Sequence, residues 1–263
     1  MQPAAEVLVA ELSEMDFDMF IEEDDAVKAY KEGAIPSQEA IMELSVFSMP
    51  DQQVEWESSM VEKKNWNAEW ESSFQPIHVE DQVSVRAPFH DPTGFSYDII
   101  IQPKMSFGTG HHDTTWLMLR EIIALDCKGK RVLDMGSGTG VLAILAEKRG
   151  AAELDAIDID EWAKENCDEN AALNNCHKIK SIHGDVGSIG TNYDIVLANI
   201  NRNILLADLP AYAESLVSEG HLLLSGFFPS DFKALEEKCN SIGLNLQSAE
   251  ERNGWGMMHF TRS

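Results

Sequence analysis

The chain has 263 residues and carries 45 acidic side chains against 20 Lys and Arg, a formal net charge of −25. A surface this negative repels phosphate groups, which argues against nucleic acid or an anionic membrane as the main partner and favours a basic one. Hydrophobic residues make up 44% of the chain, enough for a packed core, which argues against disorder. The length fits one large domain, or a small domain followed by a medium one.

The first residues show neither a basic start nor a long apolar run, so they predict neither a signal peptide nor a membrane anchor. No later segment approaches the ~20 apolar residues that a membrane-spanning helix needs. The four cysteines, Cys127, Cys167, Cys176 and Cys239, show none of the paired spacing of zinc sites or disulfide frameworks. We therefore expect a cytoplasmic protein without a metal site.

The negative charge is concentrated in the first part of the chain. Residues 1–100 hold 22 acidic and 5 basic side chains, a net charge of −17, whereas residues 101–263 hold 23 and 15, a net charge of −8. Such an asymmetry indicates two regions with different partners.

The first region shows the pattern of a small α+β domain. Apolar periodicity and turn residues predict, in order, a helix ending near Met15, strands at 17–21 and 26–30 joined by a turn at 24–25, a helix after the N-cap Ser37, and a strand at 54–57. This order matches a ferredoxin-like unit without its first strand, and we assign it to residues 1–60. Because that strand is central in such sheets, its loss would leave backbone groups unpaired, so we expect a truncated chain or a misassigned start.

A connecting helix is expected at 61–75, because Trp66, Trp70 and Phe74 recur every four residues and would pack it onto a domain. From residue 76 onward the pattern changes. Strand-like segments lie at 78–85, 97–101, 132–134, 154–159, 179–182, 195–198, 222–224, 244–247 and 257–261. Most of them alternate with stretches of helix length, which predicts an α/β fold with a doubly wound, mostly parallel sheet over residues 76–263.

The strongest local motif is the segment 131–144, in which a strand runs through Asp134 into Gly136, Gly138 and Gly140 and then into a helix. Glycines permit positive φ angles and let a ligand lie against bare backbone. The segment therefore predicts a cofactor site, with a purely structural turn as the bland alternative.

Two cofactors fit this motif. Gly138-x-Gly140-x-x-Ala143 satisfies a dinucleotide pattern, and Asp158 lies where the ribose carboxylate of an NAD site is expected. An acid followed by alternate glycines is also typical of an S-adenosylmethionine site. We favour the second, because Asp134 would repel a pyrophosphate but is compatible with the ammonium and sulfonium of S-adenosylmethionine.

Polar residues follow the next three strands, at the edge where such sheets bind ligands. Asp158 is placed to accept both ribose hydroxyls, while Asp160 is expected to cap the next helix. Asp185 could bond the adenine amino group or simply close a turn. We place Asn199 beside the methyl acceptor, where its carbonyl would hold the N–H groups of an amine, although it could instead cap the helix that begins near residue 204.

A second unusual segment, residues 102–115, combines glycines with His111, His112, Asp113 and a threonine pair ahead of a helix. It predicts a flexible loop followed by a helix cap at Asp113 or Thr114. A metal site is not favoured, because adjacent side chains diverge and the sequence shows no matching cluster elsewhere.

Taken together, these motifs resemble the PrmA family, whose members methylate large-subunit ribosomal protein eleven. The resemblance is carried by residues 103–115, 133–140, 156–160 and 198–200 and by the linker motif Trp66-Asn-x-x-Trp70. It implies a class I S-adenosylmethionine-dependent methyltransferase domain with a seven-stranded sheet, preceded by a ferredoxin-like substrate-recognition domain. The chain departs from the family in the missing first strand and in Asp113, where the family often has proline.

The resemblance also implies roles for individual residues. The donor contacts it implies are Thr115, Gly136, Asp158 and Asn199, with Phe107, Gly108 and Thr109 in a mobile loop over the donor. The motifs themselves add three donor-binding residues, Asp134, Gly138 and Asp185. The implied acceptors are the N-terminal α-amine and lysine side chains of the ribosomal protein.

The favoured function is methyl transfer from S-adenosylmethionine to these amines, with Asn199 as the catalytic residue and His111 or His112 as a candidate base. Such an enzyme would bind a basic ribosomal protein, act as a monomer, and contact neither nucleic acid nor membrane directly. The alternatives are a methyltransferase acting on another protein amine or a glutamine amide, an NAD-dependent oxidoreductase, and a noncatalytic acidic binding protein.

Overall fold

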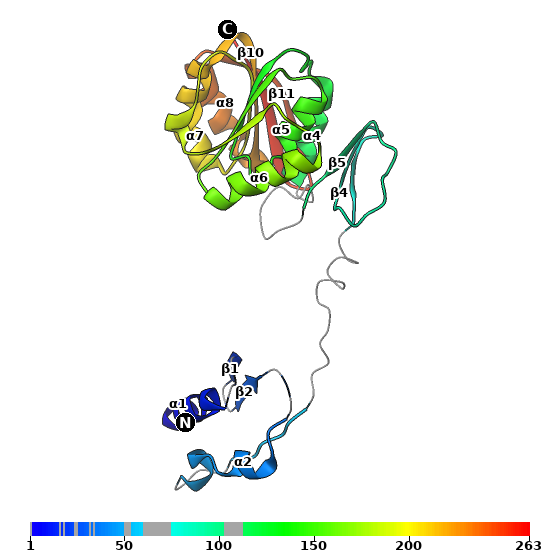
Figure 1. Cartoon of the computed structure of the whole chain (residues 1–263). Helices are drawn as coiled ribbons and strands as arrows, with labels where there is room; N and C mark the ends of the chain where they lie inside the picture. The colour runs from blue at the N-terminus through cyan, green and yellow to red at the C-terminus, as the bar shows by residue number, and fades with distance from the viewer. Residues whose placement is uncertain are drawn as a thin grey trace. The chain divides into compact units, whose positions relative to one another are not determined.

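The computed structural model describes residues 2–15, 17, 19–23, 26–31, 33, 35–49, 54–59, 75–102 and 113–263. The chain divides into two compact units, Met1–Asn67 and Ala68–Ser263, which are considered separately (Figure 1). Among the described residues, none of the helices is long and apolar enough to cross a membrane. The predicted turn at 24–25, the helix at 61–74 and the loop at 103–112 lie outside the described residues.

The first unit has the helix and hairpin that the sequence predicts. Its described elements are α1 (Gln2–Glu14), β1 (Met19–Glu23), β2 (Ala26–Tyr30), α2 (Gln38–Met42) and the short 3₁₀ helix η1 (Ser45–Ser48). The strands pair antiparallel, and the side chain of Ser37 caps α2 by accepting from Ala40 N. A small core forms around the buried side chains of Leu12, Ile41, Leu44 and Val46.

The prediction of a last strand in this unit is wrong. Residues 54–59 have no regular secondary structure, although Val54 packs against the small core. An alternating sequence becomes a strand only when a neighbour supplies backbone partners. The two described strands of the unit pair with each other, and neither pairs with residues 54–59.

The second unit is built on a seven-stranded sheet in the order β11-β12-β10-β9-β6-β7-β8. The bounds of its strands are β6 (Arg131–Met135), β7 (Glu153–Asp158), β8 (Ile179–His183), β9 (Tyr193–Asn199), β10 (Leu216–Phe227), β11 (Leu244–Arg252) and β12 (Trp255–Arg262). The strands β6 to β10 pair in parallel, and β12 runs antiparallel to both β10 and β11. The predicted doubly wound, mostly parallel sheet is confirmed.

Helices cover both faces of this sheet (Figure 1). Successive side chains of a strand point to opposite faces of the sheet, and both faces of β6 are apolar. Val132 belongs to one hydrophobic cluster and its neighbour Leu133 to the other. The first cluster packs α4 (Asp113–Ala124), α5 (Val141–Lys148) and α6 (Glu161–Leu173) on one face, and the second packs α7 (Arg202–Ser215) and α8 (Phe232–Ser241) on the other. Two short 3₁₀ helices, η2 (Val186–Ser188) and η3 (Pro229–Asp231), complete the described elements of this layer.

Before the large sheet in the sequence, the chain forms a three-stranded sheet of β3 (Ile77–Val79), β4 (Val83–Arg86) and β5 (Tyr97–Ile100). The prediction of a single strand over 78–85 is therefore wrong. The chain turns at Glu80, whose φ is +48°, and β3 and β4 pair antiparallel. The polar run from Glu80 to Gln82 interrupts the apolar alternation and permits this turn.

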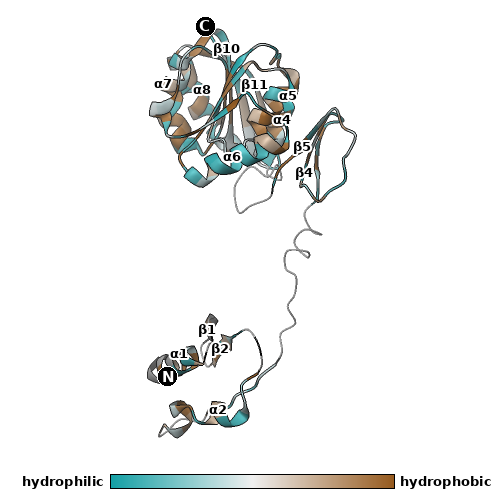
Figure 2. Cartoon of the chain, viewed as in Figure 1, coloured by the Kyte–Doolittle hydropathy of each residue, from teal (hydrophilic) through white to brown (hydrophobic). Residues whose placement is uncertain are grey.

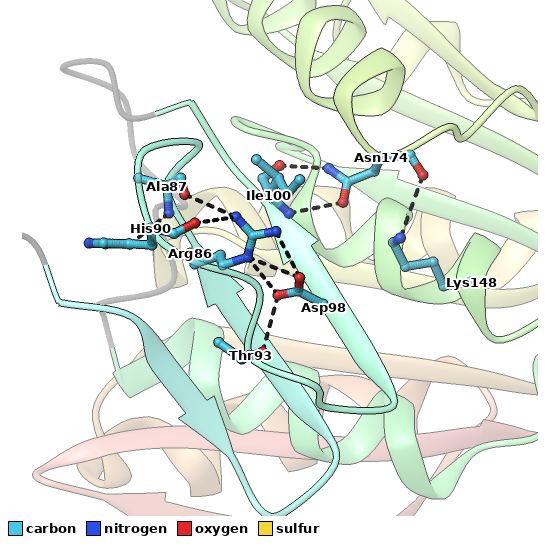
Figure 3. Close-up of polar contacts among 8 residues, drawn as sticks. All are labelled: Arg86, Ala87, His90, Thr93, Asp98, Ile100, Lys148 and Asn174. Carbon is cyan, nitrogen blue, oxygen red and sulfur yellow. Dashed lines mark hydrogen bonds and ion pairs between the residues drawn. The ribbon is translucent and has the colours of Figure 1, made fainter.

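An ion pair between a buried arginine and a partly exposed aspartate joins β4 to β5 (Figure 3). The Arg86 guanidinium donates from Nε and Nη2 to the Asp98 carboxylate at 2.8–2.9 Å, and from Nη1 to the carbonyl of His90 at 2.8 Å. Thr93 adds a hydroxyl bond to Asp98 at 3.2 Å. These bonds hold the segment between β4 and β5 against both strands.

The two halves of this pair differ in exposure, since the side chain of Arg86 is 7% exposed and that of Asp98 is 23% exposed. We expect Asp98→Ala to lower the free energy of unfolding by about 3–5 kcal/mol, because it leaves a guanidinium buried without its counter-ion. Arg86→Met should cost less, roughly 1–3 kcal/mol, because the carboxylate can reach water. Urea denaturation of both variants measures the difference; an equal or larger loss in Arg86→Met would contradict it.

Candidate active site

The candidate site lies at the carboxyl edge of the large sheet, where β6 leads into the Gly-rich turn 136–140 and then into α5. The amides of Gly136 and Ser137 donate to the carbonyl of Ile157 on β7 at 2.8 and 3.1 Å, which holds the turn against the neighbouring strand. All three glycines of the turn have positive φ, +69° at Gly136, +52° at Gly138 and +77° at Gly140. The turn thus uses the backbone freedom that the sequence motif predicts.

The glycines also permit close approaches. A Cβ at Gly136 would lie 2.7 Å from Ile200 Cγ1, and a Cβ at Gly140 would lie 2.5 Å from Cys167 Sγ. The segment after β9 and the helix α6 therefore press directly on the turn. Its shape depends on both neighbours as well as on its own residues.

Asp134, on strand β6 just ahead of the glycines, is 1% exposed. Its Oδ2 accepts from the amide of Ala143 at 3.1 Å, whereas Oδ1 has no hydrogen-bond partner among the described residues. Burial raises the pKa of this carboxyl to about 7, and the charge of Asp158 adds to the effect. A buried acceptor without a partner is costly, and it suits a site that receives a cationic ligand.

Asp158 is the last residue of β7, and its carboxylate is held by two backbone amides. Oδ2 accepts from Gly138 at 2.9 Å and Oδ1 accepts from Asp160 at 3.0 Å. Each carboxylate oxygen keeps a lone pair for a further donor. Asp160 occupies the N-cap position of α6 as predicted, although its side chain makes no capping bond.

Asp185 follows β8, is exposed, and accepts from the amide of Gly187 at 2.9 Å, which caps η2. Asp185 thus closes a turn, which is one of the two roles predicted for it. A contact with adenine stays a prediction.

Asn199 is the last residue of β9 and pairs with Ser225 of β10. Its Nδ2 donates to Oγ1 of Thr115 at 3.4 Å, so the fold joins two predicted site residues that are 84 positions apart. Thr115 is 2% exposed and lies in the first turn of α4. The bond fixes the orientation of the Asn199 amide, whose carbonyl oxygen can accept from an N–H group.

The alternative role of Asn199 as a helix cap is wrong. The cap of α7 is Asn201, whose Oδ1 accepts from the amides of Asn203 and Ile204, both at 3.2 Å. At the end of β9, Asn199 thus bonds Thr115 and Asn201 caps α7. Spacing in the sequence does not separate them.

Phe107, Gly108, Thr109, His111 and His112 lie outside the described residues, so the expectations placed on them stay predictions. In the described part of the chain, no three His, Cys, Asp or Glu side chains converge in a metal-binding cluster. All four cysteines are buried free thiols.

Comparison with known proteins decides the family. The family model for ribosomal protein L11 methyltransferase (PrmA) matches residues 5–263. The chain belongs to this family. It is 41% identical to the ribosomal protein L11 methyltransferase of Phocaeicola vulgatus over 97% of this chain and 92% of that protein. The protein of the same name from Porphyromonas gingivalis is 49% identical over 72% of this chain and 66% of that protein.

A solved structure of the ribosomal protein L11 methylase of Lactobacillus delbrueckii subsp. bulgaricus has the same fold, with a TM-score of 0.67 and 25% identity, covering 72% of this chain and 98% of that chain. The predicted class I methyltransferase fold and the predicted family are therefore confirmed. Membership of the PrmA family makes S-adenosylmethionine the methyl donor and rules against the NAD alternative.

The residues at the sheet edge fit this donor. The unpartnered Oδ1 of Asp134 suits its ammonium, and the fixed carboxylate of Asp158 suits a pair of ribose hydroxyls. When bound, S-adenosylmethionine supplies an electrophilic methyl group on a sulfonium.

Proposed function

We propose that the protein methylates amines of ribosomal protein L11, namely its N-terminal α-amine and lysine side chains. The observation that carries the proposal is the Asn199 amide, fixed by Thr115 at the carboxyl edge beside the donor turn. An amide carbonyl in that place can hold an amine N–H and so orient the nitrogen lone pair for an in-line attack. We infer the substrate from the names of the relatives, which are ribosomal protein L11 methyltransferases.

The amine must lose a proton before it attacks. A terminal amine with a pKa of ~7.7–8.0 is roughly 10% neutral at pH 7, whereas lysine, with a pKa near 10.4, is neutral in about one molecule of several thousand. Desolvation lowers the pKa of an amine and raises this fraction. Asn199 would hold and orient the amine while its proton leaves to water.

Mass spectrometry of L11 and the other ribosomal proteins from a methylation-deficient bacterium, incubated with the protein and S-adenosylmethionine, tests the proposal. Methyl groups on the terminal nitrogen and on lysines are expected. Methylation confined to glutamine, or to another ribosomal protein, would support the other acceptors instead. Binding of S-adenosylmethionine without any product would support a noncatalytic binding protein.

The acidic residues 1–100 would attract this substrate electrostatically. Ribosomal proteins are generally basic because they bind RNA, and residues 1–100 carry a net charge of −17. Complementary charge mainly raises the rate of association and makes it depend on salt. The monomer would then act in the cytoplasm, where ribosomes are assembled, without binding RNA itself.

We expect the association rate with L11 to fall at least tenfold between about 0.01 and 0.5 M salt, because the Debye length shrinks from ~30 Å to a few ångström over this range. Stopped-flow measurements at several salt concentrations give this slope. An association rate that does not change with salt would make the acidity a solubility feature.

A further inference from the structure

Helix α6 and its C-cap residue, Asn174, carry three buried asparagines at intervals of four residues. Asn166 and Asn170 are 0% exposed and Asn174 is 6% exposed, although the helix is largely hydrophilic in Figure 2. Residues four apart lie on one face of a helix. Because buried amides must be hydrogen-bonded, this face is a row of polar attachments to neighbouring chain segments.

Asn174 attaches the small sheet. Its Oδ1 accepts from the amide of Ile100 at 2.9 Å, and its Nδ2 donates to the Ile100 carbonyl at 2.6 Å, so the side chain pairs with the end of β5 as a neighbouring strand would (Figure 3). Nδ2 also donates to the carbonyl of Asn170 at 2.8 Å, within its own helix. These bonds join β5 to the end of α6 and do not involve the Gly-rich turn.

Asn170, one turn earlier, makes a different connection. Its Oδ1 accepts from the amide of Gln102 at 2.8 Å, and its Nδ2 donates to the carbonyl of Thr139 at 3.0 Å and to Oδ1 of Asn166 at 3.4 Å. Thr139 is 0% exposed and belongs to the Gly-rich turn. Asn170 thus ties the backbone of that turn to the chain that leaves β5.

Other contacts also hold the turn, among them the bonds from the Gly136 and Ser137 amides to the carbonyl of Ile157. Asp158 holds it through Gly138, and Cys167 of α6 packs where Gly140 leaves no Cβ. Removal of the Asn170 amide would take this partner from the Thr139 carbonyl and the Gln102 amide, and the turn could shift to replace the lost bond. Any contact between the backbone of residues 136–140 and the donor depends on the shape of this turn.

We propose that Asn170 is a positioning residue for the methyl donor, acting through the Thr139 carbonyl to hold the Gly-rich turn in its binding shape. The inference rests on the donor of the family and is independent of the acceptor proposed above. It predicts that loss of the amide weakens donor binding, whereas the same loss at Asn174 affects stability alone.

The test compares Asn170→Leu with Asn174→Leu, two neutral changes of similar volume on the same helix face. We expect both to lower the melting temperature. Only Asn170→Leu should raise the Kd for S-adenosylmethionine, by about tenfold, equivalent to ~1.4 kcal/mol. Calorimetric titration measures Kd, and hydrogen exchange of the peptide that holds residues 136–140 should rise in Asn170→Leu and stay unchanged in Asn174→Leu.

A milder pair, Asn170→Ser and Asn174→Ser, repeats the comparison if a leucine variant does not fold. In steady-state assays Asn170→Ser should raise the KM for the donor and leave kcat within about twofold, because its effect is on binding. An equal change of donor Kd in the two members of a pair, or no change in either, would overturn the proposal. Neither result depends on which amine accepts the methyl group.

Discussion

Replacing Asn199 with alanine is expected to lower turnover by about tenfold to a hundredfold while the Kd for S-adenosylmethionine changes much less. The amide carbonyl would orient the acceptor nitrogen, and lost orientation lowers the rate of the bound complex more than it weakens binding of the donor. Single-turnover kinetics with saturating donor and L11 measure the chemical step, and calorimetry measures donor binding.

Asn201→Ala is the matched control. It removes an amide two residues away that caps α7 through Asn203 and Ile204. We expect it to lower the free energy of unfolding by about 1 kcal/mol and to leave turnover unchanged below the melting temperature. Unchanged turnover in Asn199→Ala would remove Asn199 from the mechanism.

Thr115→Val probes the same amide from its other side. The valine keeps the shape of the side chain but removes Oγ1, the acceptor for Asn199 Nδ2. Turnover should fall by less than in Asn199→Ala, because the amide remains and loses only its orientation. A double variant should then lose little more than Asn199→Ala alone, since the two changes remove one interaction.

The second unit shows how far local pattern reaches. Its strands were predictable because a parallel sheet with helices on both faces buries each strand twice and leaves continuous apolar runs such as 195–198. The hairpin of β3 and β4 was not, because a short polar turn at Glu80 falls inside an otherwise strand-like segment. The strand expected at 54–57 failed for a non-local reason, since pattern does not specify whether a pairing partner exists.

The candidate site divides in the same way. The acid, the glycines and Asn199 were predictable because each lies at or just after the end of a strand, and the carboxyl ends of parallel strands share one edge. The bond between Asn199 and Thr115 and the attachment of Thr139 to Asn170 were not, because they join residues distant in the chain. The four-residue spacing of Asn166, Asn170 and Asn174 was a visible signal, because it puts three amides on one side of α6 and its C-cap.

Asp134→Asn should stabilise the free protein at pH 8 and weaken donor binding. Burial raises the pKa of Asp134 to about 7, above the ordinary value of 3.8 that it has in the unfolded chain. Between these values the folded state holds a proton that the unfolded state has lost, so the stability that Asp134 contributes falls as pH rises from about 4 to 7. Asparagine removes the cost of the buried charge, and the unfolding free energy at pH 8 should rise by about 1 kcal/mol or more.

Donor binding should respond in the opposite direction. The carboxylate offers its unpartnered Oδ1 to the ammonium of S-adenosylmethionine, and a hydrogen bond between charged groups is worth about 1.5–3 kcal/mol, or roughly tenfold to a hundredfold in Kd. Because the donor favours the ionised carboxyl, wild-type binding near pH 6.5 should release a proton and become tighter as pH rises through 7. Asp134→Asn should bind more weakly and without this pH dependence.

Calorimetry in buffers of different ionisation enthalpy counts the released protons, and urea denaturation at pH 6 and 8 gives the stabilities. The control is Asp91→Asn, which makes the same change of charge at an exposed position in the connection between β4 and β5. It should alter neither quantity. If Asp134→Asn retained the proton release of the wild type, the titrating group would be another residue and Asp134 would have no part in holding the donor. If both effects appear together, a carboxyl that destabilises the free fold is retained because it binds the donor.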